Sequence, residues 1–184
     1  MTTDSDAPNA AERPAAVRPT LGRGVYIAPT AYVGGRVTLG DECTVMHQVV
    51  IRGDVSEITI GARVNVQDGT VIHTRGGVPL EIADDVSIGH LACVHCRSVG
   101  PFSLIGIKST VLDNARVGGW CIVAAGAVVT PGTIIPDGKL ALGTPARVVR
   151  DVTDEERAYI RYVVENYRKL GRAHAAGAYP NWSA

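Results

Sequence analysis

Residues 99–135 read V-GPFSLI-GIKSTV-LDNARV-GGWCIV-AAGAVV-TPGTII, and every block of six ends on an aliphatic residue. Neither the 3.6-residue period of a helix nor the alternation of a plain strand produces a repeat of six. A β-solenoid does, because each hexad forms a short strand and a turn, with its aliphatic side chain pointing inward. This stretch therefore predicts a β-solenoid.

The same rhythm extends through most of the chain. It begins at Ile27, gains three residues before Ile60 and four before Ile82, and loses one before Val99. Hexapeptide solenoids close a triangular coil with three hexads, so the series predicts about six coils over residues 21–150. The inward positions are Ile27, Val33, Leu39, Val45, Ile51, Ile60, Val66, Ile72, Ile82, Ile88, Val94, Val99, Ile105, Val111, Val117, Val123, Val129, Ile135 and Ala141.

The two ends of the chain follow other patterns. Residues 1–20 are rich in Ala, Pro and polar residues and are expected to form a flexible arm. Thr153 and Glu156 have the spacing of a capping box, and an apolar stripe follows, so residues 151–171 are expected to form a helix packed on the solenoid or on a neighbour. Gly171 is expected to end this helix, and residues 172–184 to form a loose tail with a solvated His174.

Composition excludes several classes of function. The chain has 18 basic and 18 acidic residues and no basic run, so neither nucleic acid nor a membrane surface is expected as a partner. No apolar run approaches the length of a membrane span, and no secretory signal is visible. The four cysteines lack the spacing of a disulfide scaffold or a zinc ribbon, which favours reduced thiols in a cytoplasmic protein.

Phase counting places the histidines on two corners of the triangular coil. Arg52, His73 and His95 each follow an inward residue of the same edge, so they stack at one corner, roughly 5 Å apart. His90 follows another edge and belongs to a second corner. That corner also carries Asn65, Gln67 and Asp68.

This partition favours a metal site shared between two chains. His73 and His95 are close enough to share one ion, whereas His90 lies a full edge away. If the two corners meet in a three-fold ring, His90 of a neighbouring copy completes the site, and Arg52 faces Asp68 across the interface. Zinc suits three histidines, and so do iron and cobalt. The alternative is that these are ordinary solvated histidines.

Several segments resemble the γ-class carbonic anhydrases, which are left-handed parallel β-helices. These segments cover about residues 24–169, and they are Ile51-Arg-Gly-Asp54, Asn65-Val-Gln-Asp-Gly-Thr-Val-Ile-His73, Ile88-Gly-His90, Val94-His95 and Gly143-Thr-Pro-Ala-Arg147. The resemblance implies a homotrimer in which His73 and His95 of one subunit and His90 of the next bind zinc. It also implies that Arg52, Asp54 and Asp68 lie at the interface, with Asn65 and Gln67 near the metal-bound solvent.

The implied reaction is the reversible hydration of CO2 to bicarbonate by zinc-bound hydroxide. Zinc held by three histidines lowers the pKa of bound water to about 7, and Gln67 is expected to orient the hydroxide or the substrate.

The chain departs from the family pattern where a proton shuttle is expected. Val55 follows Asp54 in place of a glutamate, and the loop Thr74–Pro79 contains no acid. Arg97 and Lys108 stand where the family pattern has uncharged turn residues, and they favour either an anionic or CoA-bearing ligand or plain solvation. Two other functions therefore stay open: an acyl-CoA transferase or thioesterase that uses the cleft between subunits, and a non-catalytic metal-binding or assembly subunit.

Overall fold

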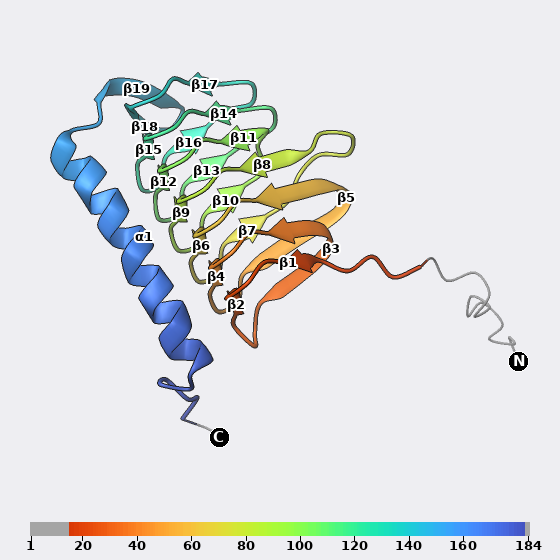
Figure 1. Ribbon diagram of the computed structural model, residues 1–184. Helices are drawn as coiled ribbons and strands as arrows, with labels where there is room; N and C mark the ends of the chain where they lie inside the picture. The colour runs from red at the N-terminus through yellow and green to blue at the C-terminus, as the bar shows by residue number, and fades with distance from the viewer. Residues whose placement is uncertain (1–14, 183–184) are drawn as a thin grey trace, which may run out of the picture.

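The computed structural model describes residues 15–182, which form a three-sided parallel β-solenoid with one helix along its side (Figure 1). The predicted fold class is confirmed. The solenoid has about seven turns, slightly more than the six expected, because partial coils are present at both ends. Residues 1–14 of the predicted arm lie outside the described part of the chain.

The first side of the prism carries one short strand per coil, and we call it the helix face because α1 packs on it. Its strands are parallel and in register, and β19 is added to β18 as an antiparallel hairpin. The strands are β2 (Tyr26–Ile27), β4 (Thr44–Val45), β6 (Asn65–Val66), β9 (Ser87–Ile88), β12 (Leu104–Ile105), β15 (Ile122–Val123), β18 (Lys139–Gly143) and β19 (Ala146–Asp151).

The other two sides are joined by two long strands that bend from one side to the next, β3 (Tyr32–Leu39) and β5 (Val50–Ile60). We call the second side the histidine face. It contains the first halves of β3 and β5, followed by β7 (Val71–Ile72), β10 (Cys93–Val94), β13 (Thr110–Val111) and β16 (Val128–Val129). The third face contains β1 (Thr20–Leu21), the second halves of β3 and β5, β8 (Leu80–Ile82), β11 (Ser98–Val99), β14 (Arg116–Val117) and β17 (Ile134–Ile135).

The inward positions of the repeat form the core. The aliphatic residues from Leu39 to Ala141 are almost fully buried in one continuous cluster, while Ile27 and Val33 in the first coil are partly buried. Cys43 and Cys121, two residues before the inward position, fill the space between them. Burial raises the pKa of the Cys43 thiol to about 11, and all four cysteines are free thiols. The repeat thus places small or aliphatic side chains inside at every coil.

Helix α1 (Asp154–Ala175) runs back along the helix face from the β18 end toward β2 (Figure 1). The predicted capping box is confirmed, because the Thr153 side chain accepts from the Glu156 N–H and the Glu156 carboxylate accepts from the Thr153 N–H. The buried stripe contains Ile160, Val163 and Val164. In residues 15–182 no helix combines the length and the apolar character needed to cross a membrane.

The predicted helix end was wrong by four residues. Gly171 lies inside the helix and is buried against Thr44, so its missing side chain permits close packing rather than a helix stop. The helix continues to Ala175. His174, expected in solvent, packs between the rings of Tyr26 and Tyr179, at centroid distances of 5.3 and 4.9 Å.

Candidate functional site

His73 and His95 lie side by side at the corner that follows the histidine face. The pairing of β7 with β10 brings them together, since Ile72 lies opposite Val94 and each histidine comes next in its chain segment. Nδ1 of His73 and Nε2 of His95 are 3.2 Å apart, and the ring centroids are separated by 5.2 Å. The predicted stacking of these two side chains is confirmed.

An aspartate lies against the outer nitrogen of each of these rings. Asp54 Oδ1 is 3.0 Å from His73 Nε2, and Asp113 Oδ1 is 2.5 Å from His95 Nδ1. Hydrogen bonds from Arg52, and then from His73, hold the pKa of Asp54 below its usual range, so this carboxylate is ionised at neutral pH. A carboxylate only accepts hydrogen bonds, which makes the outer ring nitrogens the donors.

These hydrogen bonds have a consequence for the two inner nitrogens. A neutral imidazole carries one N–H, so rings that donate to Asp54 and Asp113 turn two lone pairs toward each other. Two nitrogen atoms that point lone pairs at each other across 3.2 Å repel unless a cation, either a proton or a metal ion, lies between them. Two ligands of a tetrahedral zinc ion with Zn–N of about 2.0–2.1 Å are separated by roughly 3.3 Å. The His73–His95 pair therefore fits two ligand positions of a zinc ion, with the aspartates fixing the ring tautomers.

His90 lies at the other corner, after the helix face, as phase counting predicted. Its Nδ1 is 3.0 Å from Asp68 Oδ2, and its Nε2 is 3.3 Å from the hydroxyl of Tyr167 on α1. Burial, followed by the charge of Asp68, raises the pKa of Tyr167, so this phenol stays protonated. Among residues 15–182, no three His, Cys, Asp or Glu side chains converge to hold a metal ion. Within one chain, the three candidate ligands are divided between two corners.

Gln67 and Asn65 stand one coil below His90 and are 6% and 1% exposed. The Asn65 amide donates to Ser87 Oγ at 2.7 Å, and Gln67 Nε2 donates to Asn65 Oδ1 at 3.0 Å. Asn65 is thus behind Gln67 and fixes its orientation. Gln67 is the member of the pair that reaches the surface of the corner.

The other predicted residues make contacts inside the chain. Arg52 pairs with Asp54, so both flank the His73–His95 pair. Arg97 donates to the Pro79 carbonyl at 3.3 Å and ties down the loop that follows His73. The Lys108 N–H donates to the His90 carbonyl, while its side chain is exposed. The pairing of Arg52 with Asp68 of a neighbouring chain stays a prediction.

The sequence analysis missed three residues of this region, namely Asp113, Tyr167 and Ser87. Asp113 could have been found by continuing the phase count, since it comes two residues after the inward Val111, one coil above Val94. Tyr167 carried no such signal, because its spacing only placed it on the apolar stripe of the helix.

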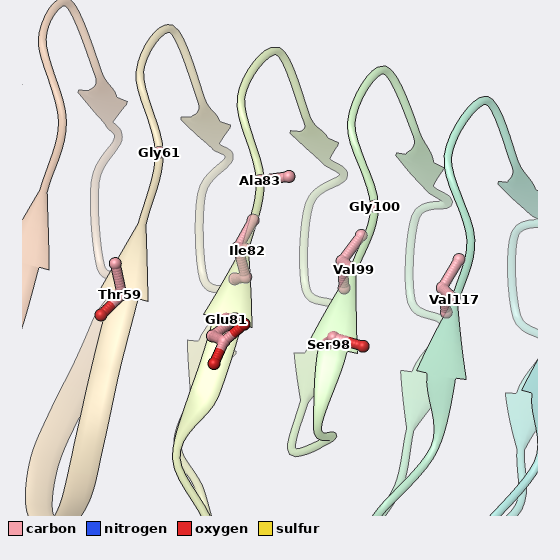
Figure 2. A pocket seen from close by; sticks show the side chains of 9 residues that line it. All are labelled: Thr59, Gly61, Glu81, Ile82, Ala83, Ser98, Val99, Gly100 and Val117. Atoms are coloured by element: carbon pink, nitrogen blue, oxygen red, sulfur yellow. The ribbon is translucent and has the colours of Figure 1, made fainter.

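Two hollows on the surface differ in their position relative to the candidate site. A groove of about 230 Å³ begins at Gln67 and runs between the helix face and α1. A broader, shallow hollow of about 560 Å³ lies on the third face, where Thr59, Glu81 and Ser98 point outward (Figure 2). It has one acidic side chain and no histidine or cysteine in its lining, so the groove at Gln67 is the one that adjoins the candidate site.

Comparison with known proteins agrees with the hexapeptide-repeat fold. The sequence model of the bacterial transferase hexapeptide family (six repeats) matches residues 18–53. The chain is 37% identical to a carbonic anhydrase of Geobacillus kaustophilus, over 86% of this chain and 87% of that protein. It is also 37% identical to the mitochondrial gamma carbonic anhydrase 2 of Arabidopsis thaliana, but spans only 59% of the length of that relative.

A solved structure with a different description is also similar. The crystal structure of a hexapeptide transferase family protein from Anaplasma phagocytophilum superposes with a TM-score of 0.81 at 35% identity, covering 85% of this chain and 93% of that one. The hexapeptide repeat and the sequence identity to carbonic anhydrases over most of the chain indicate the same family, and the arrangement of the histidines is compatible with it. The chain belongs to the γ-class carbonic anhydrase family of hexapeptide-repeat proteins.

Proposed function

We propose that this protein catalyses the reversible hydration of CO2 to bicarbonate at a zinc centre formed between two subunits of a homotrimer. The observation that carries the proposal is the His73–His95 pair, whose inner nitrogens are 3.2 Å apart with a carboxylate behind each ring. A metal ion between these nitrogens would offset the repulsion of their lone pairs, as a shared proton also would, and His90 of the neighbouring subunit supplies the third imidazole. Iron or cobalt would suit the same ligands.

Zinc bound by three imidazoles lowers the pKa of a water molecule to about 7 and so supplies a nucleophile for CO2 at neutral pH. The chain contributes the orientation of every other group. Asp54 and Asp113 fix the tautomers of His73 and His95, and Asp68 does the same for His90.

Gln67 is the group that positions the substrate or the attacking oxygen. Its Nε2 is held by Asn65, which in turn is held by Ser87, so the amide cannot rotate freely. For His90 Nε2 to hold a metal ion, the Tyr167 hydroxyl would have to move away from this nitrogen. This contact is long, at 3.3 Å, so its loss costs little.

The departures from the family pattern favour slow turnover. Val55 is exposed and apolar where some members of the family carry a glutamate, and the loop at 74–79 contains no acid. A proton that leaves the site therefore has no carboxylate in these positions to receive it. We also propose a cytoplasmic location, because four cysteines that form no disulfide with one another are typical of proteins in a reducing compartment.

The experiment is a joint measurement of metal content and CO2 hydration on the purified oligomer. We expect about one zinc ion per chain in the wild type, and loss of both metal and hydration in His90→Ala. His47→Ala is the matched control, because His47 lies on the same corner two coils below and its Nδ1 bonds Thr30 Oγ1. Wild-type oligomers that neither contain metal nor take it up from added zinc would contradict the proposal.

An acyl-CoA transferase or thioesterase is the second candidate, supported by the transferase name of the Anaplasma relative. No long loop interrupts the coils in residues 15–182, and the short loop at 74–79 has no histidine to act as a general base, which argues against this candidate. Saturable turnover of a CoA thioester would favour this candidate over CO2 hydration.

A further inference from the structure

The groove that begins at Gln67 is built as a narrow channel along the helix face. One wall is formed by Leu104 and Ile122, which point outward from β12 and β15, and α1 contributes Tyr159 and Val163 on the other side. Its volume is about 230 Å³. Apart from Gln67 and the Tyr159 hydroxyl, the side chains that line it are apolar.

The floor of the groove is kept smooth by small residues in successive coils. Gly89, Gly106 and Ala124 occupy equivalent positions above Gln67, one coil apart. A Cβ at Gly89 would lie 2.8 Å from the Ile107 nitrogen, and one at Gly106 would lie 2.6 Å from the Ala125 nitrogen, so larger residues do not fit there. The distance from Gly89 to Ala124 is two coil steps, or roughly 10 Å.

A buried polar group closes the lower end. Gln67 is 6% exposed, and one of its Nε2 hydrogens is taken by Asn65. In the part of the chain that the structure describes, nothing accepts from its second hydrogen or donates to its Oε1. Because the Gln67 amide still reaches solvent, its second Nε2 hydrogen is free to donate to a ligand oxygen at this end of the groove.

The groove is much larger than CO2 requires. At about 30 Å³ for each water-sized group, 230 Å³ holds roughly seven heavy atoms, and the walls and floor arrange them in a line. We propose that this groove binds the hydrocarbon chain of a straight-chain carboxylic acid of about four to six carbons, with a carboxylate oxygen at Gln67.

This inference rests on the proposed function in one respect: the carboxylate would bind the same Gln67 amide that positions the substrate in CO2 hydration. Binding of the acid would therefore compete with CO2 hydration. The groove itself is formed by a single chain and needs no metal, so the binding can be measured separately from activity.

The test is calorimetric titration of the purified oligomer with the sodium salts of the unbranched acids from acetate to octanoate. Each buried methylene should tighten binding by about fourfold until the groove is filled near hexanoate, where the affinity should level off. Ala124→Leu fills the upper end of the groove. The affinity should then level off at an acid two to three carbons shorter, because the leucine side chain adds three carbon atoms. Ala178→Leu, in the exposed tail, is the matched control and should keep the wild-type profile.

A second variant guards against a folding defect in Ala124→Leu. Tyr159 is 56% exposed, so Tyr159→Ala should fold normally while opening one wall and weakening the longer acids more than acetate. An affinity that does not change with chain length would overturn the inference. So would an Ala124→Leu profile equal to that of the wild type. Either result would mean that the groove is filled by a neighbouring subunit or by α1 itself. Chain-length dependence without CO2 hydration would refute the proposed function alone, and hydration with a flat series would refute the groove alone.

Discussion

The division of the candidate ligands between two corners leads to a prediction about mixed oligomers. His73 and His95 are in contact, whereas His90 contacts Asp68 and Tyr167 at another corner. A His90→Ala chain therefore keeps the paired ligands, and a His95→Ala chain keeps the single one. Neither variant alone can assemble a complete site, but an interface between the two chains can.

The expected recovery follows from how the chains assort. If the two variants are co-expressed in equal amounts and assort randomly, each chain at an interface is the one required half of the time, so about one quarter of the interfaces are complete. The mixed preparation should bind about one quarter of the wild-type zinc and show the same fraction of hydration activity. Each variant expressed alone should show neither.

The assay is metal analysis of the gel-filtered oligomer, with the hydration rate measured on the same sample. A matched control mixes His90→Ala with His90→Ala,His95→Ala, which contains no complete interface in any arrangement. Recovery equal to that control would refute the shared site. Full metal retention in His90→Ala alone would show instead that the site lies within one chain.

Three further predictions follow from single contacts. Asp113→Asn should weaken zinc binding by about 10- to 100-fold in a chelator competition, because it removes the carboxylate 2.5 Å from His95 Nδ1; a change below twofold would contradict this role. Glu156 bonds Arg150 and the Thr153 N–H, which lowers its pKa from 4.5 to about 2, so its stabilisation is present above pH 4.5 and is lost as the pH falls toward 2. Glu156→Gln should thus lower the free energy of unfolding at pH 7 by about 1 kcal/mol, allowing for solvent screening, and should weaken the fall of that free energy, measured by urea unfolding, as the pH drops from 4.5 toward 2. Glu57→Gln, at an exposed glutamate of β5, should do neither. Iodoacetamide at neutral pH should label Cys93 first, since it is the one partly exposed thiol. Equal labelling of the three buried thiols, Cys43, Cys96 and Cys121, would be inconsistent with the fold.

The fold could be predicted because one physical requirement repeats in every coil. Each hexad must place an aliphatic side chain inside a narrow prism, so a single error of phase would expose all later ones. Counting the repeat across two insertions places Ile51, Ile72 and Val94 on one edge, and in the structure these residues lie opposite one another in the paired strands β5, β7 and β10. The helix end had no comparable constraint. Gly171 has the same appearance in the sequence whether it stops a helix or allows α1 to approach Thr44.

The candidate site was predictable only as far as the coil geometry determines it. Phase gives the corner and the height of a residue, and this was enough to pair His73 with His95 and to separate His90. It does not give the side-chain rotamer, on which the contact between Asp113 and His95 depends. That contact changes the interpretation of the histidines. Two stacked imidazoles alone are compatible with solvated side chains, which can share hydrogen bonds with water. Once both outer nitrogens donate to carboxylates, the two inner nitrogens face each other at 3.2 Å with their lone pairs, and this arrangement favours a cation between them, either a proton or a metal ion.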